Sequence, residues 1–202
     1  DFSENYLTAT GAETLCAFFT RYSVTCMVLK LHKNLLDDKA LKYIARYLTS
    51  FNQAPVQELH LSHNHITARG IQWLFASLAM HPAYPAWNQR TQSFAPLWLR
   101  LEHNKCSQAE AVEMLRWCGE MLDISVCLMV DDSACTSTKC AEVHRLFPKG
   151  TQKHNCVAHL RYFVRDKAAV SGTLRQPQPH ALPFFASLRV RMPKLPSRAR
   201  RG

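Results

Sequence analysis

The stretch Leu59-His60-Leu61-Ser62-His63-Asn64-His65-Ile66 has the pattern L-x-L-x-x-N-x-(L/I), which recurs along the chain. The other copies are Leu29-Lys30-Leu31-His32-Lys33-Asn34-Leu35-Leu36, Leu99-Arg100-Leu101-Glu102-His103-Asn104-Lys105-Cys106 and a weaker one, Val126-Cys127-Leu128-Met129-Val130-Asp131. Alternate residues of a strand point to the same side. Each copy therefore predicts a short strand with two core leucines, followed by a tight turn.

The asparagines of the pattern are spaced almost regularly. Asn5 lies 29 residues before Asn34, Asn64 lies 30 residues after it, and Asn104 follows after a further 40. An asparagine side chain can bond the backbone groups of a turn. We expect these side chains to form a ladder of hydrogen bonds from one unit to the next.

The segment after each asparagine has the apolar spacing of an amphipathic helix, with residues at i, i+3, i+4 and i+7 on one face. Four such stripes occur, consisting of Ala12, Leu15, Cys16 and Phe19, of Leu41, Ile44, Ala45 and Leu48, of Ile71, Leu74, Phe75 and Leu78, and of Ala111, Met114, Leu115 and Cys118. Each unit is thus predicted to be a strand, a turn and a helix.

Residues 1–131, about two-thirds of the chain, resemble leucine-rich repeat proteins of the ribonuclease-inhibitor-like class, whose repeats have this strand, turn and helix. The resemblance implies an α/β solenoid, a short horseshoe with parallel strands and outer helices. The competing interpretation is an ordinary α/β domain without repeats. Such a domain would have to contain the L-x-L-x-x-N pattern three times by chance, each time followed by a helix at the same spacing. The chain begins with Asp1 and has no cap before the first repeat, so we expect further sequence upstream.

The connection over residues 79–96 is about ten residues longer than the others and contains Pro82, Pro85 and Pro96, which prevent the helix from continuing. We expect an ordered loop on one rim. Its aromatic side chains Tyr84, Trp87 and Phe94 either pack against the repeats or contact a partner.

The resemblance implies a concave face formed by the strand residues that alternate with the core leucines. The candidate partner-binding residues are Lys30, His32, His60, Ser62, Trp98, Arg100 and Glu102, together with Tyr84 and Trp87 of the rim loop. The row continues with Cys127 and Met129. Trp and Arg are favoured anchors in protein interfaces, so a protein partner is expected, although a plain solvated sheet surface is the competing interpretation.

No nucleophile, base and orienting group recur at a known spacing, and no glycine-rich phosphate loop is present. We therefore expect a non-catalytic protein-interaction scaffold with no small-molecule substrate. Proteins with this class of repeat inhibit enzymes, activate small GTPases or sense ligands, so the resemblance alone does not select a role.

Residues 132–160 form a Cys/His-rich segment expected to cap the repeats. Its candidate metal ligands are Cys135, Cys140, His144, His154, Cys156 and His159, which are enough donors for a structural zinc site. The spacing matches no common zinc finger, and buried thiols with surface histidines are the other interpretation. A hydrolytic zinc at Cys135, Cys140, His144 and Cys156 is a third hypothesis that lacks an open-site signature.

Residues 161–202 form a basic, proline-rich and mostly disordered tail. Residues 160–202 carry 10 Lys and Arg against one acidic residue, whereas residues 1–159 carry 15 against 14. Such a basic end can bind nucleic-acid phosphates by counterion release, so the alternative function is that of a nucleic-acid-associated protein. A tail without a selected function is equally compatible with this charge distribution. No apolar run spans a membrane, and we expect an intracellular protein, cytoplasmic or nuclear.

Overall fold

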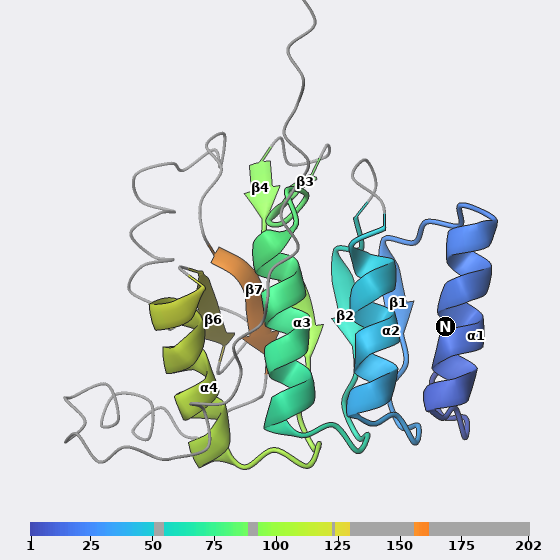
Figure 1. Cartoon of the computed structure of the whole chain (residues 1–202), viewed down its shortest axis with the longest axis horizontal. Helices are drawn as coiled ribbons and strands as arrows, with labels where there is room; N and C mark the ends of the chain where they lie inside the picture. The colour runs from blue at the N-terminus through green and yellow to red at the C-terminus, as the bar shows by residue number, and fades with distance from the viewer. Residues whose placement is uncertain (51–54, 89–92, 123, 130–155, 162–202) are drawn as a thin grey trace, which may run out of the picture.

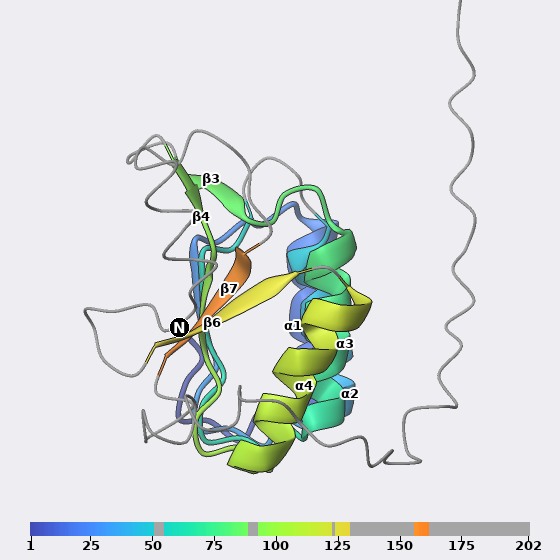
Figure 2. The same ribbon diagram turned by 90° about the vertical axis from the view of Figure 1, so that its left-hand side faces the viewer.

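The computed structural model describes residues 1–50, 55–88, 93–122, 124–129 and 156–161. These residues form two layers, a parallel sheet and a row of helices that covers one of its faces (Figure 1 and Figure 2). The helices are α1 (Ala9–Arg21), α2 (Asp38–Leu48), α3 (Ala68–Met80) and α4 (Gln108–Met121). The prediction of an α/β fold with parallel strands and helices on one side is confirmed.

The main sheet has five parallel strands in the order β1-β2-β5-β7-β6. They are β1 (Val28–Lys30), β2 (Glu58–His60), β5 (Leu97–Arg100), β6 (Ser125–Met129) and β7 (Cys156–Arg161). The register places Leu29 beside Leu59 and Leu59 beside Leu99. Equivalent leucines of the three sequence copies therefore lie next to one another in the core.

The strand order differs from the order of the sequence copies in one place. Strand β6, which comes from the weakest copy, does not pair with β5, because β7 lies between them. Ala158 and Leu160 of β7 are buried and align with Leu97 and Leu99 of β5. The end of the predicted Cys/His-rich capping segment is thus a central strand, because its alternating apolar side chains match the core face of β5.

The helices begin at polar caps and bury the predicted stripes. The side chain of Asp37 accepts the amide of Ala40 at the start of α2, and Ser107 and Glu110 form a capping box at the start of α4. The stripes of α2 and α3 are buried in full, over Leu41, Ile44, Ala45 and Leu48 and over Ile71, Leu74, Phe75 and Leu78. The faces predicted for α2 and α3 are confirmed in full, and the buried residues of α1 and α4 include Ala12, Cys16 and Phe19 and Met114 and Cys118 of their predicted stripes.

The asparagines form the expected ladder between units. Asn64 accepts the amide of Leu36 at 3.0 Å through Oδ1, and its Nδ2 donates to the carbonyl of Leu31 at 3.0 Å. Equivalent bonds link Asn34 and Asn104 to the units before them. The residue before each asparagine has a positive φ, between 53° and 59° at Glu4, Lys33, His63 and His103. This left-handed conformation turns the chain out of the strand.

Helices α2 and α3 are joined at their starts by Asp38. Its two carboxylate oxygens accept from the amide of Thr67 at 2.8 Å and from the hydroxyl of Thr67 at 2.7 Å. A Cβ added at Gly70 would lie 2.4 Å from Oδ1 of Asp38. Glycine at this position therefore lets the carboxylate reach the cap of the next helix.

The long connection contains an antiparallel hairpin of β3 (Ala86–Asn88) and β4 (Ser93–Ala95), which lies at one end of the sheet (Figure 2). The rings of Trp87 and Phe94 pack edge to face with centroids 5.1 Å apart. The expected ordered rim loop is therefore a hairpin held by a cross-strand aromatic pair.

Candidate functional site

The face of the sheet opposite the described helices, called here the helix-free face, brings most of the predicted partner-binding residues together. The register aligns Lys30 of β1 with His60 of β2, and His60 with Arg100 of β5. His32, Ser62 and Glu102 form the next row, since the backbone bonds from Lys33 to Ser62 and from His63 to Glu102 continue the same register. The strands thus present two parallel rows of polar side chains.

Contacts between side chains two residues apart hold these rows in place. Nε of Arg100 donates to Oε1 of Glu102 at 2.8 Å, and a second guanidinium nitrogen donates to the same oxygen. Nε2 of His60 lies 2.5 Å from Oε1 of Glu58. Both pairs join residues two apart, which point to the same side of a strand. The face therefore carries fixed and partly neutralised charges.

Two buried polar atoms of this face have no hydrogen-bond partner among the described residues. They are Oε2 of Glu102, whose side chain is 8% exposed, and Nδ1 of His32. An unsatisfied buried acceptor costs free energy, because it has lost its bonds to water. A hydrogen-bond donor placed over Glu102 would recover that loss.

The surroundings of His32 favour its neutral form. Burial lowers its pKa from the usual value of histidine, and the neighbouring His60 lowers it further through charge repulsion. The two imidazole rings have centroids 6.2 Å apart. Protonation of His32 is therefore less favourable than that of an exposed histidine.

A further row lies where the strands turn toward the helices. Nζ of Lys33 lies 3.0 Å from Oε1 of Glu4, and the rings of His63 and His103 stack with centroids 4.3 Å apart. Burial lowers the pKa of His63, and repulsion from His103 adds to the shift. These residues and Glu58 were not among the predicted contact residues, although each lies at a constant offset from the repeated leucines and asparagines.

Three of the predicted contact residues are buried, namely Tyr84, Ser62 and Glu102, and Glu102 is the least buried of them at 8% exposed. Tyr84 is 3% exposed and its hydroxyl donates to the carbonyl of Val56 at 3.1 Å, so it belongs to the core rather than to a rim surface. Ser62 is also only 3% exposed. Trp98 is half-buried, and Trp87 remains 38% exposed on the hairpin.

The predicted zinc ligands fall largely outside the described residues, and these are Cys135, Cys140, His144 and His154. Cys156 and His159 lie in β7, where His159 pairs with Trp98 and Cys127 across the sheet. Within the described ranges no three His, Cys, Asp or Glu side chains are grouped as metal ligands. The basic tail over residues 162–202 also lies outside them.

In the part of the chain that the structure describes, no helix has the length and apolar character needed to cross a membrane. The chain matches no protein-family model and no curated protein. Its function has to be argued from the geometry of its own residues.

Proposed function

We propose that this protein is a non-catalytic interaction scaffold built from leucine-rich repeats of the ribonuclease-inhibitor-like class, and that it binds a protein partner on the helix-free face of its sheet. The class is supported by the repeated asparagine bonds, the left-handed residue before each asparagine and the aligned parallel strands. In this proposal the sheet face is the concave surface of a solenoid.

The observation that carries the proposed function is the unsatisfied oxygen of Glu102. Arg100 bonds only Oε1 of this carboxylate, and Oε2 is buried without a partner in the described part of the chain. Oε2 is closed to water in this arrangement, so a donor of the partner reaches it when neighbouring side chains of the face move aside, and it then gains the missing bond. A lysine, arginine or backbone amide of the partner has the required chemistry.

Neighbouring side chains of the sheet face can bind acidic and aromatic groups of the partner. Lys30 forms no ion pair with any described residue and lies beside His60, so an acidic group of the partner can bind there. Trp98 lies one residue before the core Leu99 and adds aromatic surface. The proposed partner therefore presents both a basic and an acidic group, and surface complementarity rather than covalent chemistry is the mechanism.

Affinity capture with two matched variants tests this function. Glu102→Gln changes the carboxylate on the sheet face, and Glu113→Gln makes the same change on α4. We expect Glu102→Gln to weaken capture of a defined protein by at least about tenfold and Glu113→Gln to leave it unchanged. Equal losses in both variants would contradict a binding site on the sheet face.

The nucleic-acid alternative requires its own comparison. Capture is repeated after nuclease treatment and with Arg198, Arg200 and Arg201 all replaced by glutamine. A partner that binds the sheet face survives both changes. Capture that disappears with nuclease or with the three arginines assigns the binding to the basic tail instead and overturns the proposed function.

A further inference from the structure

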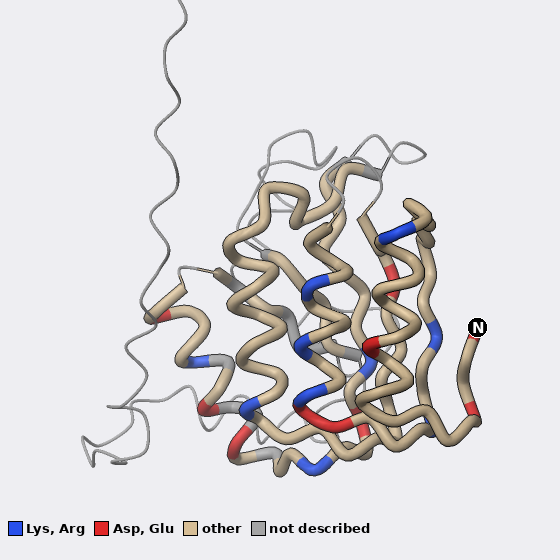
Figure 3. Tube along the Cα trace, turned by 45° about the vertical axis from the view of Figure 1, so that its right-hand side comes forward, with Lys and Arg blue, Asp and Glu red and all other residues tan. Residues whose placement is uncertain are grey.

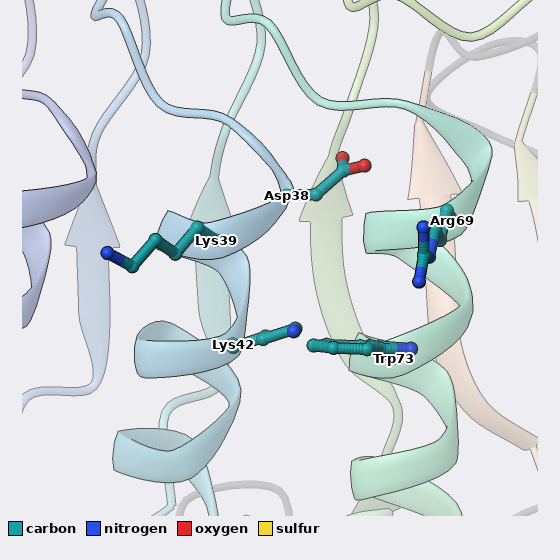
Figure 4. Close-up of a pocket in the computed structure, with 5 residues that line it drawn as sticks. All are labelled: Asp38, Lys39, Lys42, Arg69 and Trp73. Atoms are coloured by element: carbon teal, nitrogen blue, oxygen red, sulfur yellow. The ribbon is translucent and has the colours of Figure 1, made fainter.

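A second candidate site lies on the opposite side of the molecule, on the helical layer. A hollow of about 240 Å³ opens between α2 and α3 and is lined by Asp38, Lys39, Lys42, Arg69 and Trp73 (Figure 4). Lys42 and Arg69 lie at the hollow with the carboxylate of Asp38, whereas the side chain of Lys39 extends away from α3 (Figure 4). The proposed function makes no use of these residues.

The basic residues of α2 follow one stripe of the helix. Lys39, Lys42 and Arg46 are spaced by three and four residues, which places them on one face, as Figure 3 shows along this helix. Like charges at this spacing destabilise a helix. None of Lys39, Lys42 and Arg69 forms an ion pair with another described residue, so no carboxylate of the described fold is paired with these charges.

Asp38 offsets one basic charge at this hollow. Both of its oxygens are engaged by Thr67, and the absence of a Cβ at Gly70 allows this close approach. The carboxylate is therefore held at the start of α3 and forms no ion pair with a described basic side chain. Lys42 and Arg69 together leave a surplus of one positive charge at the hollow.

The ammonium group of Lys42 is held at the hollow by a contact with Trp73. Its Nζ lies 3.1 Å from the centroid of the Trp73 ring, in a cation–π contact. The contact restrains a flexible side chain at the wall of the hollow and leaves its N–H donors able to bond a ligand. Trp73 is half-buried, so part of its ring remains as an apolar surface beside the charges.

The charges change sign along the helical layer. Helix α4, beyond α3, carries Glu110, Glu113 and Glu120 against Arg116, and Figure 3 shows acidic positions along it. An extended polyanion or an anionic membrane lying across the helices would be repelled by α4. A single compact anion seated between α2 and α3 would not.

We propose that this hollow binds the phosphate group of a phosphorylated side chain on a partner peptide. A phosphate monoester carries about −1.5 to −2 charges at pH 7, enough to bind both basic groups at the hollow. Arg69 offers a guanidinium fork for its oxygens, and Lys42 offers ammonium donors. The apolar ring of Trp73 suits the carbon chain that carries the phosphate rather than a bare ion.

The test follows the indole N–H signal of Trp73 by NMR in the full-length chain, assigned with Trp73→Phe. A pentapeptide with one phosphoserine among alanines and glycines is titrated at fixed ionic strength. This signal reports on the hollow alone, so binding of the peptide to the basic tail does not interfere. Lys42→Met and Arg69→Met remove charges of the hollow, and Arg116→Met removes the same charge from α4, where it is paired with Glu113 and Glu120.

We expect a saturable shift whose dissociation constant rises at least about tenfold in Lys42→Met and in Arg69→Met, and changes less than about twofold in Arg116→Met. The aspartate version of the peptide binds more weakly. Four results overturn the proposal: no saturable shift, equal losses in all three variants, inorganic phosphate as tight as the peptide, or a single-stranded oligonucleotide tighter than the peptide.

Discussion

The side-chain oxygen of Asn64 accepts the amide of Leu36 at 3.0 Å, although the two residues are 28 positions apart. The side-chain Nδ2 of Asn64 also donates to the carbonyls of Leu31 and Leu61, so one buried side chain bonds two units of the chain. Each unit is thereby held to the one before it. The packed leucines lie directly beneath these bonds.

We therefore expect Asn64→Ala to lower the free energy of unfolding by about 2–4 kcal/mol, because several buried backbone groups lose their partners. Asn5→Ala is the matched control, since the side chain of Asn5 is exposed and, among the described residues, bonds only the carbonyls of Phe2 and Ser3. Its expected cost is below about 0.5 kcal/mol. Urea denaturation measures both variants, and equal losses would show that the ladder does not stabilise the stack.

Gly70→Ala tests the close approach of Asp38 to α3. The added Cβ would lie 2.4 Å from the carboxylate of Asp38 and 3.1 Å from its Cα, so we expect a loss of about 1–3 kcal/mol. Gly11→Ala in α1 is the control, because its Cβ would meet only the side-chain end of Leu7. Alanine favours both helices equally. In an Asp38→Ala background most of the cost at residue 70 should disappear, and a cost that persists would contradict this explanation.

Lys33→Gly tests the left-handed residue before an asparagine. Lys33 has a φ of 53°, a conformation that a side chain disfavours by about 1 kcal/mol. Lys33→Ala removes the exposed contact with Glu4 but keeps the strain. Thermal melts should show Lys33→Gly more stable than Lys33→Ala by about 1 kcal/mol. The opposite order would show that the turn does not strain this residue.

The repeated strands, the asparagine ladder and the buried helix faces could be predicted from the sequence because each depends on a local period. Leu29, Leu59 and Leu99 align in the sheet as their spacing suggested. Strand β7 could not be placed in this way, since pairing of Leu160 with Leu99 joins distant segments and carries no period. The alternating Ala158 and Leu160 were the available signal for a strand. The nearby cysteines and histidines favoured the interpretation of this segment as a metal-binding cap instead.

The rows of residues on the candidate site could be predicted from the sequence, but the exposure of each side chain could not. Lys30, His60 and Arg100 follow from strand alternation and lie in one row. The burial of Ser62 and Tyr84 depends on neighbouring side chains and on the hairpin, which local patterns do not describe. The hollow beside Trp73 requires two helices in contact, so no single segment predicts it.

The stability of the fold should decrease as the pH is lowered from about 7 to about 5. The pKa of His32 and that of His63 lie below 6.5 in the folded chain, mainly because of burial, so the unfolded chain binds protons first. This destabilisation is absent at pH values above the pKa of these histidines in the unfolded chain, and it grows as the pH falls below that pKa. In the double variant His32→Asn, His63→Asn, urea denaturation should show a smaller loss between these pH values; an unchanged loss would contradict the assignment.

The most direct test of the proposed scaffold is photo-cross-linking from the two faces of the sheet-and-helix stack. A photoreactive amino acid replaces Lys30 on the helix-free face or Arg116 on α4, and cross-linked products are identified by mass spectrometry. The account predicts a defined protein cross-linked from position 30 and absent from position 116. Products that are the same from both positions, or that contain only nucleic acid, would contradict it.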